Sequence, residues 1–181
     1  MHRMSEHQLQ TSPAYSDRYI DGLLATVGVD KSRKAIHTLL SAYRKASAPV
    51  IHIVHETPSG APVFTPDSRL AKTFEELEPQ SGETVITKNH PGSFTGTNLQ
   101  EVLQQAGKSK VVLVGYMAHV CVSTTTRQAA EKGYDVILPR EAIGDRDIPG
   151  IKGEDLVDVV LKELGDAFGT VVSVDSIVNS Q

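Results

Sequence analysis

Short apolar runs alternate with amphipathic stretches along most of this chain. The apolar runs are rich in β-branched residues and predict buried strands at residues 49–56, 83–88, 110–116, 134–139 and 169–174. Between them, apolar residues recur at helical spacing and predict helices at residues 31–46, from residue 97 onward, and at 122–132 and 151–164. This order predicts an α/β domain of three layers, in which helices cover both faces of a largely parallel central sheet.

Two segments fall outside this alternation. Residues 1–21 are polar, carry Pro13 and contain no apolar run, so they predict an extended or partly disordered arm rather than a buried strand. Residues 57–81 are rich in Pro, Gly and Ser, which is typical of a long surface loop, with one short helix expected around Leu70 to Phe74. We therefore expect a single domain over residues 22–181.

Composition narrows the classes of function. The 181 residues are 39% hydrophobic and carry a net charge of −4 without a basic run, which disfavours nucleic acid and anionic membranes as partners and favours a small-molecule ligand. A lone cysteine excludes an internal disulfide, and the sequence contains neither a leader pattern nor an apolar stretch of about 18 residues. These features predict a cytoplasmic protein.

The lone cysteine, Cys121, follows the apolar run at residues 110–116 and precedes the predicted helix at 122–132. A helix start offers unpaired N–H groups and the positive end of the macrodipole, which favour a thiolate and can hold a developing oxyanion. This position suits a nucleophile. A buried structural cysteine is the alternative interpretation, because free cysteines are among the most buried residues.

A lysine stands in an equivalent place. Lys88 ends the predicted strand at 83–88, and in a parallel sheet the carboxyl ends of the strands share one edge, where ligands bind. Lys88 and Cys121 should therefore point toward the same edge. A lysine beside a thiol favours the charged thiolate. A solvated strand end is the alternative for Lys88.

Two long motifs resemble the isochorismatase-like cysteine hydrolases. One is GYMAHVCVSTTTRQAAEKGYDVILPREA, at residues 115–142, and the other is VITKNHPGSFTGTNLQEVL, at residues 85–103. The matching positions are Gly115, Cys121, Val122, Ala129, Gly133, Tyr134 and Ala142 in the first, and Lys88, Ser93, Phe94, Gly96, Thr97 and Leu99 in the second. The resemblance runs from about residue 22 to the C-terminus and implies the Rossmann-like fold of that family.

The resemblance also implies a catalytic triad of cysteine, lysine and aspartate. Cys121 would attack a carbonyl carbon, Lys88 would stabilise the thiolate, and the aspartate would move the proton. The N–H groups of Cys121 and Met117 would hold the oxyanion, with Met117 following a cis peptide bond from Tyr116. The residues expected around oxyanion and substrate are Met117, Tyr116, Ala118, His119 and Phe94.

The sequence departs from the family at its N-terminus. Aligned on Tyr19 and Gly22, the position of the family's aspartate falls on Ala14, and the residues before it do not supply the apolar strand that lies mid-sheet in relatives. Either the polar arm fills that gap, or a partner chain does, or the sequence is a truncated or alternative product. Asp17 and Asp21 are the nearest substitutes for the missing base.

The remaining histidines and aspartates do not form a metal site in the sequence. His52 and His55 are three residues apart on a predicted strand, which places them on opposite faces. His90 and His119 fall near the expected site, where His119 either shapes it, assists proton transfer or is a plain hydrogen-bonding residue. Two aspartates in the loop after the predicted strand at 134–139 are interpreted as turn residues. They are Asp145 and Asp147. We expect neither a catalytic metal nor a cofactor.

These observations predict a hydrolase that cleaves the C–N bond of a small amide through an acyl-enzyme on Cys121. A catalytically inactive relative, kept as an oligomeric or regulatory binding protein, is the first alternative. The second is hydrolysis of a vinyl ether of the isochorismate type. Because relatives commonly self-associate, and a missing strand would expose an apolar edge, we also expect a homo-oligomer.

Overall fold

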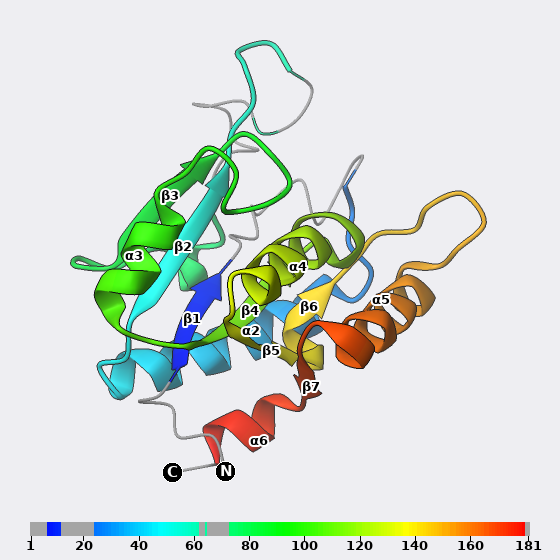
Figure 1. The fold of residues 1–181 in the computed structure, drawn as a ribbon. Helices are drawn as coiled ribbons and strands as arrows, with labels where there is room; N and C mark the ends of the chain where they lie inside the picture. Colours follow the sequence, from blue (N-terminus) through cyan, green and yellow to red (C-terminus); the bar gives the residue numbers. More distant parts are fainter. Residues whose placement is uncertain (1–6, 12–23, 62–63, 65–72, 180–181) are drawn as a thin grey trace.

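The computed structural model describes residues 7–11, 24–61, 64 and 73–179. Its strands pair in parallel in the order β3-β2-β1-β4-β5-β7, and the short β6 pairs with β4 (Figure 1). They are β1 (His7–Thr11), β2 (Val50–His55), β3 (Thr84–Lys88), β4 (Lys110–Tyr116), β5 (Asp135–Pro139), β6 (Ile143–Gly144) and β7 (Thr170–Val172). The predicted α/β fold with a parallel central sheet is confirmed.

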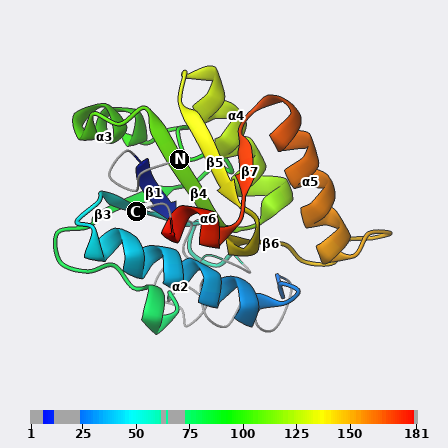
Figure 2. The ribbon, with the colours of Figure 1, turned by 90° about the horizontal axis from the view of Figure 1, so that it is seen from below.

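Helices cover both faces of this sheet. They are α2 (Val29–Lys45), α3 (Leu99–Ala106), α4 (Ser123–Glu131), α5 (Gly153–Ala167) and α6 (Val174–Val178). The view from below shows α2 and α6 on one side of the strands and α3, α4 and α5 on the other (Figure 2). Short turns η3 (Glu75–Leu77), η4 (Ala118–Val122) and η5 (Arg140–Ala142) complete the described part. None of the described helices is long and apolar enough to span a membrane.

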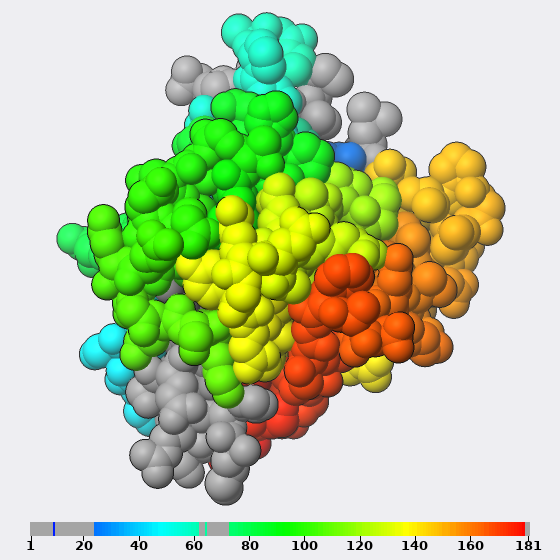
Figure 3. All heavy atoms as spheres, viewed as in Figure 1, coloured from blue at the N-terminus to red at the C-terminus, as the bar shows by residue number. Residues whose placement is uncertain are grey.

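The core consists of two clusters separated by the sheet. Val112 and Val114 of β4 belong to the cluster under α2, whereas Val111 and Leu113 belong to the cluster under α3, α4 and α5. Successive side chains of a strand point to opposite faces, so a strand buried on both sides is apolar at every position. In the space-filling view, α3, α4 and α5 lie side by side over their face (Figure 3).

Strand β1 corrects the expectation for the N-terminus. Residues His7–Thr11 pair with β2 on one side and β4 on the other, in the middle of the sheet. Leu9 lies at the centre of this strand and is fully buried. A strand with neighbours on both sides gains its backbone hydrogen bonds whatever its side chains are, so one apolar anchor suffices here. Residues 7–11 of the polar arm therefore fill the gap in the sheet.

Several element ends also differ from the expectation. Helix α2 begins at Val29, two residues earlier than predicted, after Gly28, whose φ of 62° is left-handed. Helix α5 continues past Gly165 to Ala167. The last strand is shorter than predicted, because the Ser173 hydroxyl accepts the Ser176 N–H at 3.1 Å and caps α6. The helix expected around residues 70–74 falls largely outside the described residues.

Candidate functional site

Lys88 and Cys121 meet at the carboxyl edge of the sheet, as their positions after parallel strands predicted. Lys88 is the last residue of β3, and its Nζ lies 3.3 Å from the Sγ of Cys121. The lysine is only 1% exposed, whereas Cys121 is partly exposed. The thiol is therefore reachable by a small molecule while its cationic partner is shielded from water, which strengthens their electrostatic interaction.

Neutral acceptors surround the other sides of the lysine. Its Nζ donates to the carbonyl oxygens of His90 and Pro91, at 2.8 and 3.0 Å, and lies 3.0 Å from Nδ1 of His55. Burial lowers the pKa of Lys88, and the contact with Cys121 partly opposes that shift. Among the described residues, no carboxylate forms an ion pair with this ammonium. Within the described part of the chain, the sulfur of Cys121 completes the contacts of this ammonium.

A tight turn carries the chain from β4 to Cys121. Gly115 has a φ of 114°, which favours glycine, and the peptide bond between Tyr116 and Met117 is cis, as the resemblance implied. The next residues form η4, a π-helical turn in which the Met117 carbonyl accepts the N–H groups of Val120 and Val122, both at 3.2 Å. Neither of these two hydrogen bonds involves the N–H of Cys121, which lies between them in the sequence. Such π turns are frequent at functional sites.

The side chains around this turn point into the core. The Tyr116 hydroxyl lies 2.6 Å from that of Ser32 on α2, and burial raises the pKa of Tyr116. Met117 and Ala118 are both buried. If these residues take part in the chemistry, they therefore do so through their backbone.

Sequence reasoning missed the anchor of the turn, Asp145. Its Oδ2 accepts the backbone N–H of His119 at 2.8 Å and lies 2.7 Å from Nδ1 of the same residue, while Oδ1 accepts the N–H of Arg146 at 2.8 Å. Asp145 is 1% exposed, and its contacts with His119 show that its role extends beyond its own loop. It follows β6, whose two residues are too short to produce an apolar pattern. Asp147 is a turn residue, and it accepts the N–H of Gly153 at 2.9 Å.

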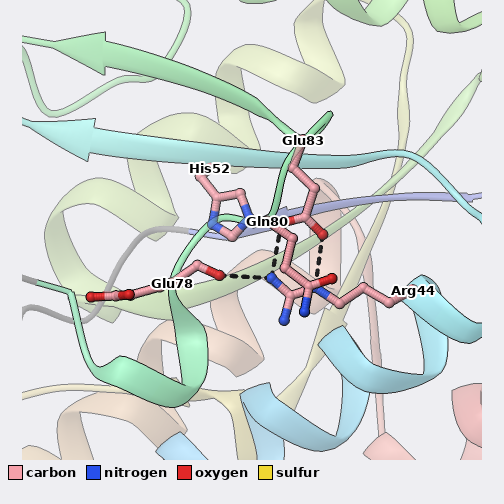
Figure 4. A network of polar contacts seen from close by, with 5 residues as sticks. All are labelled: Arg44, His52, Glu78, Gln80 and Glu83. Atoms are coloured by element: carbon pink, nitrogen blue, oxygen red, sulfur yellow. Dashed lines mark hydrogen bonds and ion pairs between the residues drawn. The ribbon is translucent and has the colours of Figure 1, made fainter.

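A second polar cluster lies at the opposite end of β3 (Figure 4). Glu83, just before this strand, accepts two hydrogen bonds from the Arg44 guanidinium, at 2.7 and 2.9 Å, and one from the Gln80 N–H at 2.8 Å. Nε2 of His52 lies 2.8 Å from the same carboxylate. Burial would raise the pKa of Glu83, but the hydrogen bonds from Arg44, Gln80 and His52 outweigh it and lower the pKa to about 2.

Comparison with known proteins decides the family. Residues 15–176 match the isochorismatase domain. The chain belongs to the isochorismatase family. A secreted isochorismatase effector of Verticillium dahliae is 57% identical over 155 residues, which are 86% of this chain and 82% of that protein. An N-carbamoylsarcosine amidase of Arthrobacter is 39% identical over 112 residues, which cover 62% of this chain and 40% of the amidase.

A solved isochorismatase structure agrees with this placement in the family. It comes from Pseudomonas putida, superposes with a TM-score of 0.93 and is 32% identical, covering 97% of this chain and 92% of its own. The expected Rossmann-like, isochorismatase-like fold is confirmed.

The expected cytoplasmic location is overturned by the first of these relatives, which is a secreted protein. The expectation rested on the lone cysteine and on the missing leader pattern. A lone cysteine is a weak indicator of compartment here, because a domain with an extensive apolar core needs no disulfide in either environment.

The resemblance to the family also raised expectations for Phe94 and for the catalytic aspartate. Phe94 lies in the loop between β3 and α3. Its ring stacks on Tyr134 at 6.2 Å and lies under Lys132 at 5.4 Å, and both of these residues follow the far end of α4. The candidates for the aspartate position, Ala14, Asp17 and Asp21, lie outside the described residues.

The described histidines belong to separate clusters. His52 contacts Glu83 just before β3, and His55 contacts Lys88 at the end of β3, so the two rings belong to different polar clusters. His90 contributes its carbonyl oxygen to Lys88. Within the part of the chain that the structure describes, no group of three metal-binding side chains comes together.

Proposed function

We propose that this member of the isochorismatase family hydrolyses the C–N bond of a small amide, with Cys121 as the nucleophile. The observation that carries the proposal is the 3.3 Å contact between the buried Lys88 ammonium and the Cys121 sulfur. A nucleophilic cysteine needs its thiolate form and access to substrate, and this pair combines both. Lys88 and Cys121 are the residues to which we assign the chemistry.

The reaction balances with these two groups. The thiolate attacks the carbonyl carbon and forms a C–S bond, and the C–N bond breaks as the leaving nitrogen takes a proton from the Lys88 ammonium. The neutral lysine then accepts a proton from water, and the resulting hydroxide adds to the thioester. Release of the acid breaks the C–S bond and restores the ion pair. The lowered pKa of Lys88 suits a group that alternates between donor and acceptor.

The backbone of the turn supports an oxyanion site. The Met117 carbonyl accepts N–H groups on either side of Cys121, which leaves the Cys121 N–H out of that bonding. We assign this N–H, together with that of Met117, to the oxyanion of the tetrahedral intermediate. The contacts of His119 with Asp145 tie the same turn to the loop after β6.

Relatives support amide chemistry as the main candidate. The similar protein from Arthrobacter is named an N-carbamoylsarcosine amidase, and a streptothricin hydrolase of Streptomyces noursei is 30% identical over 75% of this chain and 53% of its own length. A covalent route through sulfur suits acyl transfer, which has a carbonyl carbon to attack.

A specific observation favours a second candidate. The relative that is 57% identical is named an isochorismatase, and an isochorismatase acts on a vinyl ether rather than an amide. The vinyl-ether reaction needs no acyl-enzyme. Dependence on Cys121 as a nucleophile therefore separates the two candidates.

The test is a substrate panel with a matched pair of variants. Parent protein, Cys121→Ala and the surface control Lys162→Met are assayed for ammonia or amine release from primary amides and N-carbamoyl compounds, and for loss of isochorismate absorbance. The amidase proposal expects amide turnover by the parent and the control, none by Cys121→Ala, and a thioester adduct in the intact mass of the parent. Isochorismate turnover that survives Cys121→Ala establishes the second candidate. If the folded parent turns over nothing in either series, the protein is an inactive relative.

A further inference from the structure

His55 lies beside the catalytic pair in a position that the mechanism leaves unassigned. It is the last residue of β2, and in the parallel register it is the direct neighbour of Lys88 on β3. Its Nδ1 lies 3.0 Å from the lysine Nζ, and its ring packs against Phe64 with the centroids 4.7 Å apart. The imidazole therefore contacts both the Phe64 ring and the lysine.

The acceptors of Lys88 come from two directions. The carbonyl oxygens of His90 and Pro91 belong to the loop that follows β3, whereas His55 belongs to the adjacent strand. An ammonium has three N–H groups, and four acceptors compete for them when the Cys121 sulfur is counted. Without His55, the neutral anchors that remain all lie in the loop, and Nζ is free to follow that loop away from the sulfur.

The contact also bears on the tautomer of the imidazole. An ammonium can only donate, so a hydrogen bond from Lys88 requires an Nδ1 that carries no proton. A neutral acceptor holds the ammonium without neutralising it, whereas a carboxylate in the same place would compete with the thiolate for its charge.

We propose that His55 is a positioning residue that holds the Lys88 ammonium against the Cys121 sulfur by accepting a hydrogen bond on Nδ1. The inference rests on the cysteine–lysine pair of the proposed function and extends it. It makes the reactivity of Cys121 depend on a side chain that acts through Lys88.

Two substitutions separate the acceptor from the rest of the ring. His55→Asn places a carbonyl oxygen as many bonds from the backbone as Nδ1, and His55→Leu fills similar space without an acceptor. The readout is the rate constant for alkylation of Cys121 by iodoacetamide at pH 7, followed by mass spectrometry on folded protein. We expect His55→Leu to slow alkylation about tenfold and His55→Asn to stay within about threefold of the parent.

A double-mutant cycle tests whether the effect passes through the lysine. In a Lys88→Met background, His55→Leu should change the rate by less than about twofold, because the group that it positions is gone. Equal alkylation rates for His55→Leu and the parent would overturn the proposal. Equal losses of rate in His55→Asn and His55→Leu would also overturn it, as would a full tenfold loss from His55→Leu in the Lys88→Met background. A parent rate no higher than that of a free thiol would overturn it too.

Two provisions keep the outcome clear. If His55→Leu does not unfold cooperatively, His55→Val takes its place in the same comparison, since valine suits the end of a strand and also lacks an acceptor. Alkylation needs no substrate, so a parent protein that hydrolyses no amide can still pass this test, and an active amidase can still fail it. Failure of this inference is therefore distinguishable from failure of the proposed function.

Discussion

The two ends of strand β3 hold charged side chains in opposite ways. At its start, Glu83 is met by the Arg44 guanidinium, by His52 and by the Gln80 N–H, so that its charge is balanced within the cluster (Figure 4). At its end, Lys88 is met by the neutral acceptors His55, His90 and Pro91 and by the sulfur of Cys121.

The difference separates a structural role from a chemical one. A balanced and fully hydrogen-bonded pair holds elements together, and here it ties α2 to the starts of β2 and β3. A buried cation among neutral dipoles is costly unless an anion joins it, and the sulfur of Cys121, which we propose as that anion, is within reach. Substitution at the start of the strand should therefore affect folding, and substitution at its end should affect reactivity.

The largest effect is expected at the structural end. Glu83→Ala leaves the partly buried Arg44 and His52 without their shared carboxylate and should lower the free energy of unfolding by about 3 kcal/mol. Glu83→Gln, which keeps an acceptor for Arg44, should cost less. Urea unfolding measures both. The alkylation rate of Cys121 in folded protein should stay within about twofold of the parent, and a large loss there would mean that the two ends form one coupled unit.

The reactive end should show the reverse pattern. In Lys88→Met we expect alkylation of Cys121 at pH 6 to fall about a hundredfold, because an ordinary thiol of pKa about 8.5 is less than about 1% ionised at that pH. The free energy of unfolding should be equal to that of the parent or higher, since an apolar side chain replaces a buried charge. Lys162→Met, on the exposed face of α5, is the matched control. A destabilised Lys88→Met with unchanged reactivity would assign Lys88 to the scaffold.

Much of the fold was predictable, for reasons visible in single elements. The apolar run at residues 110–116 coincides with β4, because a strand buried on both faces must be apolar throughout. Strand β1 was missed, since backbone pairing with both neighbours and the anchor Leu9 compensate for a polar sequence. Strand β6 has only two residues and no readable pattern.

The site was predictable where topology decides it. Lys88 ends one parallel strand and Cys121 follows another, and such positions share one edge of the sheet. The contacts of His55 and Asp145 depend on strand register and on how a loop folds back over η4, and neither has a local signal in the sequence. The contact of the Phe94 ring with Tyr134 likewise has no local signal in the sequence.

Acidification tests the structural end without mutation. The pKa of Glu83 is lowered from 4.5 to about 2 in the fold, so its contribution is present above pH 4.5 and is lost as the pH falls toward 2. Burial lowers the pKa of His52 despite the opposing effect of Glu83. Below pH 6.5 the unfolded chain therefore takes up a proton on this residue more readily than the folded protein does, which lowers the free energy of unfolding. We expect about 2 kcal/mol to be lost between pH 5 and pH 2.5 in urea titrations. In Glu83→Gln the free energy of unfolding should depend less on pH over this range. An equal dependence in both proteins would show that Glu83 is not its cause.

The smallest effect is expected where the buried groups are neutral. The Ser32 and Tyr116 hydroxyls lie 2.6 Å apart beneath the turn that leads to Cys121. Ser32→Ala and Tyr116→Phe should each lower the free energy of unfolding by about 1 kcal/mol, and the double variant by about the same amount, because a shared hydrogen bond is lost only once. Alkylation of Cys121 should change less than about threefold in all three. Additive losses would show that each hydroxyl acts through other contacts, and a large loss of reactivity would show that this neutral pair, and not the charge on Lys88 alone, sets the state of the thiol.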